Sequence, residues 1–167
     1  MTVVQRKVCM LGATSVGKTS LVRRFVESIF SEKYQATIGV KIDRKLVELD
    51  GTQVSLLLWD LQGEDEFQRL RMSYLKGASG LILVADGTRP DTVATARALR
   101  TSAEETVGVV PSLLLLNKTD LSESWGVDDA FVDVNGPSGV PVVRTSAKTG
   151  DRVEDAFHHL VRRMLSA

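Results

Sequence analysis

Residues 12–19 read Gly-Ala-Thr-Ser-Val-Gly-Lys-Thr and join an apolar run at residues 7–12 to a helical pattern at residues 20–28. The stretch fits the phosphate-binding pattern G-x-x-x-x-G-K-[ST] in full, and in the strand and helix context that the pattern requires. Glycines let backbone N–H groups converge on a phosphate, Lys18 adds a point charge for its oxygens, and Thr19 offers a hydroxyl to Mg²⁺. The context disfavours an ordinary glycine loop, so the sequence predicts a P-loop that binds a nucleotide.

Short apolar runs alternate with longer helical patterns along the chain. The runs that are apolar almost throughout lie at residues 7–12, 54–60, 81–86, 113–117 and 140–145. Strands that are covered on both faces have this composition, and strands that alternate with helices form mainly parallel sheets. We therefore expect an α/β fold of the P-loop NTPase type, with helices on both faces of a mixed six-stranded sheet.

The remaining strand, at residues 41–49, is more polar and leads through Asp50 and Gly51, which tolerate the positive φ angles of a tight hairpin. This pair is expected to be antiparallel.

At the C-terminal end, apolar residues recur at helical spacing over residues 153–164, and Asp151 and Glu154 are spaced like a capping box. Glycine and proline make residues 121–139 loop-rich, with at most a short helix. Nothing indicates a second domain, so residues 1–167 are expected to form one.

Composition excludes several classes of protein. The 167 residues contain 21 basic and 21 acidic side chains, so the charge footprint of a nucleic-acid binder is absent. No apolar run reaches the length of a membrane span, and the N-terminus has no secretory signal. The single cysteine, Cys9, lies in an apolar run, where a buried hydrophobic role is expected rather than a nucleophilic one. We expect a monomeric protein of the cytoplasm.

A second motif, Asn117-Lys118-Thr119-Asp120, follows the apolar run at residues 113–117. A carboxylate at Asp120 can accept hydrogen bonds from the N1–H and the 2-amino group that guanine has and adenine lacks. Such a site rejects the wrong base because its own polar groups would be left unpaired. Alone, the motif would also fit a solvated turn after a strand.

The motif does not stand alone, because Thr145-Ser146-Ala147-Lys148 follows the next strand, where a backbone N–H can meet the guanine carbonyl. Together the motifs resemble the Ras superfamily of small GTPases, over essentially the whole chain and in the family's order. Tyr34-Gln35-Ala36-Thr37-Ile38-Gly39 and the pair Trp59-Asp60 are most similar to the Rab branch. The resemblance implies a Ras-like G domain that binds GTP or GDP with Mg²⁺.

The resemblance also implies roles for individual residues. Phe30 stacks near the guanine and Tyr34 lies over the phosphates. Thr37 and Asp60 act at Mg²⁺, the latter through water, and Gly63 senses the γ-phosphate, whose loss releases both loops. The nucleotide-binding residues implied are Thr14, Ser15, Val16, Gly17, Lys18, Thr19, Ser20, Phe30, Tyr34, Thr37, Gly63, Asn117, Lys118, Asp120, Ser146, Ala147 and Lys148. The metal site comprises Thr19, Thr37 and Asp60, and the catalytic set comprises Lys18, Thr37, Gly63 and Glu64.

Two positions depart from the family pattern. Glu64 occupies the place of the glutamine that orients the attacking water, and an ionised glutamate cannot donate a hydrogen bond and adds negative charge near the γ-phosphate. Gln62 is a poor substitute because it would have to project past Gly63. Thr14 is larger than the glycine or serine common at its position and can crowd the transition state. Hydrolysis is therefore expected to be slow unless a partner supplies an arginine finger.

Partner binding is implied through the switch face, to effectors, an exchange factor and an activator. Trp59 and Tyr74 match two aromatic effector positions of the Rab branch, whereas Ile42 replaces the third. Trp125 is expected either to contact a partner or to fold onto the domain surface. The chain ends without a cysteine for prenylation. It is therefore expected to be either truncated or a Rab-like protein, of prokaryotic type, that works without a lipid anchor.

Three functional readings follow from these residues. The first is a GTPase of modest rate that serves as a switch. The second is a binding module that holds GTP and hardly hydrolyses it, because of Glu64 and Thr14. The third, an ATP-dependent kinase or ATPase, is disfavoured by the guanine motif at residues 117–120 and by the lack of a lid-like arginine cluster.

Overall fold

The computed structural model describes residues 3–27, 40–61 and 72–167. Its strands are β1 (Val3–Gly12), β2 (Val40–Leu49), β3 (Thr52–Leu61), β4 (Gly80–Asp86), β5 (Ser112–Asn117) and β6 (Val142–Arg144). Its helices are α1 (Lys18–Glu27), α2 (Met72–Leu75), α3 (Asp91–Val107), α4 (Asp129–Asn135) and α5 (Val153–Ser166), with a 3₁₀ turn, η1 (Ser122–Ser124). In the described ranges no helix is long and apolar enough to cross a membrane.

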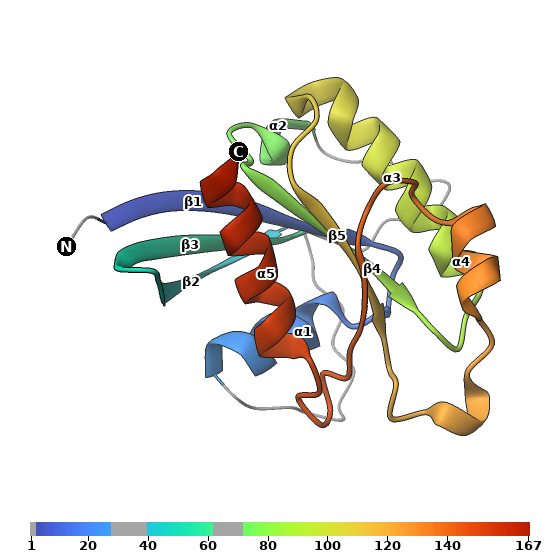
Figure 1. Cartoon of the computed structure of the whole chain (residues 1–167). Coiled ribbons are helices and arrows are strands. Elements are labelled where there is room, and N and C mark those ends of the chain that lie inside the picture. The colour runs from blue at the N-terminus through green and yellow to red at the C-terminus, as the bar shows by residue number, and fades with distance from the viewer. Residues whose placement is uncertain (1–2, 28–39, 62–71) are drawn as a thin grey trace.

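The strands form one sheet in the order β2-β3-β1-β4-β5-β6, with helices on both faces (Figure 1). Only the β2–β3 pair is antiparallel among the pairings of this sheet. The turn between these strands contains Asp50 at φ 50° and Gly51 at φ 80°. Positive φ at both central residues is what a two-residue hairpin turn requires. The predicted mixed sheet and hairpin are confirmed.

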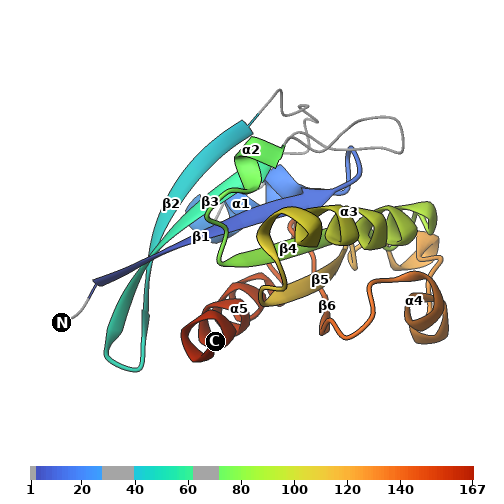
Figure 2. The same ribbon diagram turned by 90° about the horizontal axis from the view of Figure 1, so that it is seen from above.

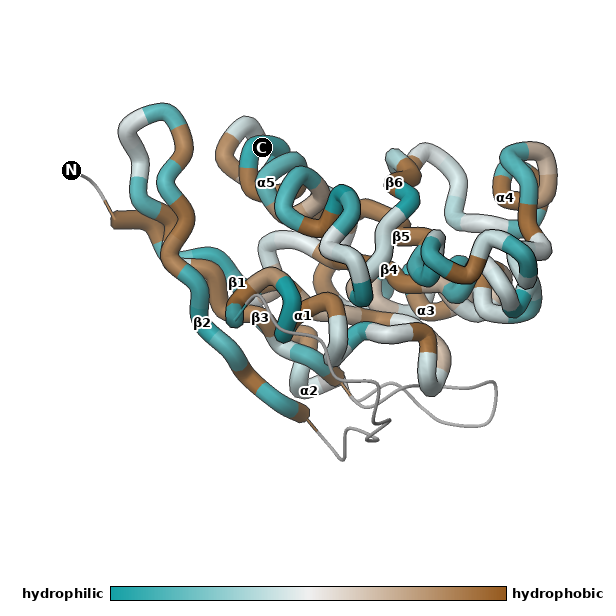
Figure 3. Tube along the Cα trace, turned by 90° about the horizontal axis from the view of Figure 1, so that it is seen from below, coloured by the Kyte–Doolittle hydropathy of each residue, from teal (hydrophilic) through white to brown (hydrophobic). Residues whose placement is uncertain are grey.

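The two faces of the sheet carry separate cores because successive strand residues point to opposite sides. Val8 and Met10 of β1 pack with α1 and α5, whereas Cys9 and Leu11 pack with α2, α3 and α4. Figure 2 shows the β2–β3 hairpin and the start of β1 extending beyond α3 and α4. In Figure 3, apolar residues gather along the central strands, and apolar and polar residues alternate along β2.

Cys9 is fully buried, as predicted for a small hydrophobic residue. Burial raises the pKa of its thiol to about 11, against a smaller lowering effect of the nearby Lys7 ammonium. A thiol with this pKa stays protonated at neutral pH and is a poor nucleophile.

Two features of the C-terminal half differ from the prediction, and one agrees with it. The last strand covers Val142–Arg144 rather than residues 140–145, because Pro141 has no N–H to contribute to the sheet. The capping box at Asp151 is wrong, since the N-cap of α5 is Arg152 in a left-handed conformation, without a side-chain capping bond. Residues 121–139 hold only η1 and the short α4, as predicted.

Helices α1 and α5 meet through a stacked pair of phenylalanines. The rings of Phe25 and Phe157 lie 4.1 Å apart between centroids, with 3° between their planes. Both side chains are 1 % exposed. This contact fixes α1, which begins inside the motif at residues 12–19, against the C-terminal helix.

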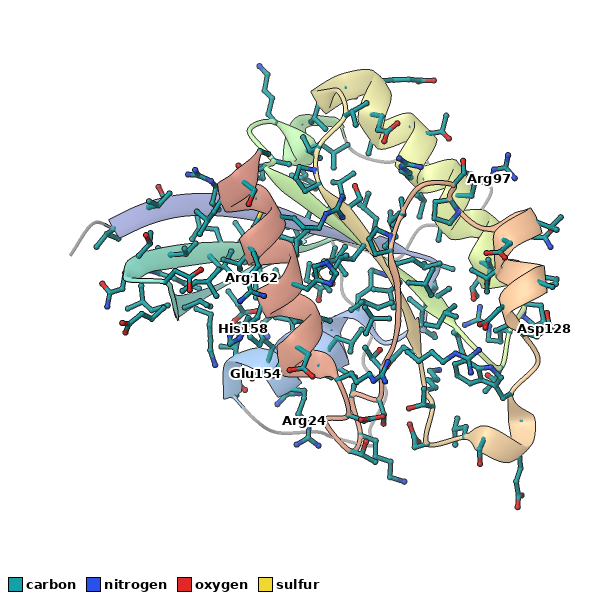
Figure 4. The ribbon with its side chains drawn as sticks, viewed as in Figure 1. Arg24, Arg97, Asp128, Glu154, His158 and Arg162 are labelled. Carbon is teal, nitrogen blue, oxygen red and sulfur yellow. The ribbon has the colours of Figure 1, made fainter. Side chains whose placement is uncertain are left out.

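Replacement of Phe157 by alanine should lower the free energy of unfolding by about 3–5 kcal/mol, because a buried aromatic side chain is lost and a cavity remains. Chemical denaturation of both proteins measures the difference. Arg162→Ala is the matched control, since Arg162 is exposed on the same helix (Figure 4) and its loss should change stability by no more than about 0.5 kcal/mol. Equal stability of Phe157→Ala and the wild type would contradict the assigned core.

Candidate functional site

The predicted motifs meet at one edge of the sheet. Strands β1, β4, β5 and β6 run parallel, so their carboxyl ends lie at the same edge. The P-loop follows β1, the guanine motif follows β5, and the loop at residues 145–148 follows β6. A crevice outside the carboxyl ends of the strands is where open α/β sheets bind ligands.

The P-loop backbone has the conformation of an anion-binding nest. Ser15 has φ 67° and Gly17 has φ 104°, and such departures into positive φ turn successive N–H groups toward one side. A Cβ at Gly17 would overlap the side-chain amide of Asn117, and one at Gly12 would lie 2.5 Å from the Val84 carbonyl oxygen. Helix α1 then begins at Lys18 and adds the positive end of its dipole.

Lys18 holds its ammonium within the loop rather than in solvent. The side chain is 6 % exposed, and Nζ donates to the carbonyl oxygens of Gly12 at 3.0 Å and Ala13 at 3.2 Å. An ammonium carries three donors and no acceptor, so an anion in the nest can share this group. Ser20, two residues further along, is half-buried in α1.

Thr19 and Asp60 bring two oxygen ligands together from α1 and β3. The Thr19 hydroxyl donates to Oδ2 of Asp60, whose side chain is fully buried near the end of β3. Mg²⁺ takes oxygen ligands, and in nucleotide sites it keeps several waters and uses few protein groups besides the phosphates. A hydroxyl and a carboxylate at the mouth of a P-loop therefore fit this ion.

Asn117 connects three segments of the site. Its Nδ2 donates to the Val16 carbonyl at 3.0 Å, and its Oδ1 accepts from the Thr145 hydroxyl and the Ala147 N–H, both at 3.2 Å. The side chain is 2 % exposed. The P-loop and the loop after β6 are thus held at fixed positions relative to one another.

Lys118 reinforces the same connection. It has φ 76°, and its Nζ donates to the Ser15 carbonyl at 2.9 Å and pairs with Oδ2 of Asp86 at 2.8 Å. Burial alone would raise the pKa of Asp86, but hydrogen bonds from Lys118 and Thr88 outweigh it and hold that pKa below its ordinary value. Asp86 therefore stays ionised as the partner of Lys118.

Asp120 and Ser146 meet at the opposite side of the guanine motif. Oδ1 of Asp120 accepts from the Ser146 hydroxyl at 2.7 Å, and Ser146 Oγ in turn accepts from the Thr149 N–H at 3.1 Å. Asp120 is exposed, so this bond sets its orientation in an open site. A carboxylate held in this way can accept from the paired donors of a guanine.

Arg24 was missed by the sequence analysis. It lies on α1 beside the loop that precedes α5 (Figure 4), and its guanidinium donates to the carbonyls of Ala147, at 2.8 Å, and Lys148. The first helix and the loop at residues 145–148 are therefore joined directly. Nothing in the sequence distinguishes Arg24 from other cations on a helix surface. Asp86 was also missed, although its position at the end of an apolar strand was visible.

Several predicted residues lie outside the described part of the chain, namely Phe30, Tyr34, Thr37, Gln62, Gly63 and Glu64. Of the aromatic effector positions, Trp59 and Tyr74 have ring centroids 6.3 Å apart, and Ile42 pairs with Trp59 across the hairpin. Trp125 folds onto the domain, where it is half-buried against the core on the α3 side of the sheet, and its Nε1 donates to the Val127 carbonyl at 2.7 Å.

The ion pair of Asp86 should show itself in the pH dependence of stability. Since the folded pKa of Asp86 lies below the unfolded value of about 3.9, its contribution is complete above that pH and is lost as the pH falls through the folded pKa. Asp86→Asn should cost about 2–4 kcal/mol at pH 7, and the difference from wild type should shrink below pH ~4. Denaturation across pH 3–7 measures this, with the exposed Asp133→Asn as control. A difference that stays constant over this range would contradict the assignment.

Comparison with known proteins agrees with the geometry of this site. A model of the Ras family matches residues 7–166. The Ras-related protein Rab-1D of Dictyostelium discoideum is 33% identical over 165 residues, which cover 93% of this chain and 78% of that protein. The chain therefore belongs to the Ras family, near its Rab branch, and is a small GTPase that binds and hydrolyses GTP.

Proposed function

We propose that this GTPase is a slow, Mg²⁺-dependent switch that reads guanine through Asp120 and Ser146 and phosphate through the P-loop. The observation that supports this most directly is the Asn117 side chain, which binds both the Val16 carbonyl of the P-loop and the Ala147 N–H of the guanine loop. Because one buried amide joins both subsites, the distance between the base site and the P-loop is fixed. GTP and GDP share the guanosine and the first two phosphates, which would span this distance.

Phosphoryl transfer in this proposal depends on position and charge rather than on covalent chemistry. The N–H groups of residues 15–19 and the Lys18 ammonium hold the β and γ oxygens. Thr19, Thr37 and Asp60 would hold Mg²⁺, which neutralises charge on the same oxygens when bound. The Gly63 N–H would contact the γ-phosphate, as the family resemblance implies. Loss of that phosphate on hydrolysis would remove this contact and set the off state.

The second candidate is a GTP-binding module with very weak hydrolysis. It is favoured by Glu64, whose carboxylate cannot donate to the transferring phosphoryl group, and by the bulk of Thr14. In that case turnover requires a partner, because an arginine finger contributes about 10³ to 10⁵ in rate. The two candidates differ only in the rate without a partner.

Effectors, an exchange factor and an activator are proposed to bind the face formed by Ile42, Trp59 and Tyr74 together with the switch segments. Ile42 is 49% exposed on the edge strand β2 and lies beside Trp59. An exposed aliphatic residue next to an aromatic ring gives a partner an apolar contact that does not need the third aromatic residue.

Glu64→Gln should raise the single-turnover rate of GTP hydrolysis by about tenfold or more, because glutamine can both accept from water and donate to phosphate. Rapid mixing of Mg²⁺ with protein loaded with GTP measures this rate. Gln62→Ala is the control and should leave the rate unchanged. An appreciable wild-type rate that neither substitution alters would show that another group positions the water, and would contradict the role given to Glu64.

Asp120→Asn should shift base preference from guanine toward xanthine. The substitution exchanges a carboxylate acceptor for an amide donor, which matches the 2-carbonyl of xanthine and leaves the 2-amino group of guanine unpaired. We expect GDP affinity to fall by at least about 10²-fold, because the donors of guanine would be left without their acceptor. Competition between GDP, XDP and ADP measures the preference, with Asp133→Asn as control. Displacement of GDP from the wild type by equimolar ADP would overturn the guanine assignment.

A further inference from the structure

Arg89 lies in the turn between β4 and α3, outside the motifs that identify the family. The turn is firmly held: Oδ1 of Asp86 accepts from the Thr88 N–H at 2.8 Å and from the Thr88 hydroxyl at 2.6 Å. The Arg89 N–H donates to the Asp86 carbonyl at 2.9 Å, and the Arg89 carbonyl accepts from the Thr92 hydroxyl at 2.7 Å. The backbone of Arg89 is therefore fixed from both sides.

From this position the side chain reaches the P-loop. Nη1 of Arg89 donates to the Thr14 carbonyl at 2.9 Å. The next carbonyl, of Ser15, accepts from Lys118, and the one after it, of Val16, accepts from Asn117. Three successive carbonyls of the loop are thus each bound by a side chain from another segment.

This row of contacts determines where the N–H groups of the loop point. In a planar trans peptide the carbonyl and the following N–H point in opposite directions. Donors that hold the carbonyls of residues 14, 15 and 16 therefore turn the N–H groups of residues 15, 16 and 17 to the other side. That side is the concave face of the nest.

The Thr14–Ser15 peptide needs such a contact more than its neighbours do. Ser15 has φ 67°, a left-handed conformation that costs energy for a residue with a Cβ. A flip of this peptide would relieve Ser15, and it would also turn the Ser15 N–H away from the nest. The Arg89 guanidinium opposes the flip because the flip breaks its hydrogen bond to Thr14.

We propose that Arg89 is a positioning residue for the phosphate site, which aims the Ser15 N–H at the bound guanine nucleotide without touching it. The proposal rests on the assignment of the P-loop as that site. Its ligand class is the polyphosphate of a nucleoside di- or triphosphate, because the N–H group concerned belongs to the nest and not to the base site. Arg89 acts from a segment that carries none of the P-loop, guanine or switch motifs.

The test compares release of a fluorescent GDP analogue from Mg²⁺-loaded wild type, Arg89→Ala and Arg89→Lys. Arg89→Ala should speed release about tenfold, as expected for loss of one hydrogen bond from a charged donor. Arg89→Lys keeps a cationic donor and should restore release to within about threefold of wild type. Arg97→Ala is the matched control, because Arg97 lies on α3 (Figure 4) and donates to the Val134 carbonyl at 3.2 Å, a contact with α4. Its release rate should stay within about twofold of wild type.

Two further readouts separate positioning from a merely structural role. The ³¹P resonances of bound GDP should move in Arg89→Ala and stay in place in Arg97→Ala. In a Ser15→Gly background, where the left-handed conformation costs nothing, Arg89→Ala should accelerate release by clearly less than tenfold.

Release from Arg89→Ala at the wild-type rate would overturn the proposal. So would an equal acceleration in Arg97→Ala, unchanged ³¹P resonances, or a full tenfold effect in the Ser15→Gly background. Failure of the proposed function would be seen in the wild type alone, as a lack of GDP binding in the presence of Mg²⁺. Failure of the Arg89 proposal would be seen only in the variants, in a wild type that binds GDP.

Discussion

The geometry of the site depends on the buried side chain of Asn117. This amide has a donor group and an acceptor group, and both are used within the protein: one on the P-loop after β1, the other on the loop after β6. Between these two strands in the sheet lie β4 and β5. Loops that are separated by two strands cannot touch through backbone pairing, so a side chain has to join them. An aspartate in its place would lose the donor and leave the Val16 carbonyl without this partner.

The cations of this site all hold carbonyl oxygens, and Lys18 does so in addition to its proposed role at the phosphates. Lys18, Lys118, Arg24 and Arg89 each donate to at least one main-chain carbonyl of the P-loop or of the loop at residues 145–148. A loop whose N–H groups all face a ligand must turn its carbonyls outward, where water would otherwise compete for them. The long side chains of Lys118 and Arg89 bind two of these outward carbonyls, those of Ser15 and Thr14. The preorganised arrangement costs little further ordering when an anion binds.

Much of this architecture was predictable from the sequence. The sheet and the hairpin at Asp50 and Gly51 follow from local apolar runs and turn residues, and the three motif loops follow from their sequence motifs. The start of α5 was not predictable from spacing, because the conformation of Arg152 is set by the preceding loop rather than by its own propensity. Arg24 and Arg89 could not be found either. Their partners are main-chain carbonyls more than 70 positions away along the chain. Every residue type has such a carbonyl, so the sequence does not indicate which one is bound.

The hairpin has a mechanical consequence for the switch. Val40 and Leu61 are paired across β2 and β3, and they border the segments at residues 28–39 and 62–71 that carry Thr37 and Gly63. The two segments that carry these proposed nucleotide-sensing residues are therefore attached to a single residue pair of one antiparallel ladder. A shift of β2 along β3 by one residue would move the two attachment points apart by one residue. It would also turn the side chains of the shifted strand to the opposite face of the sheet. The Val40–Leu61 pair thus fixes the separation between the two points at which these segments join the sheet.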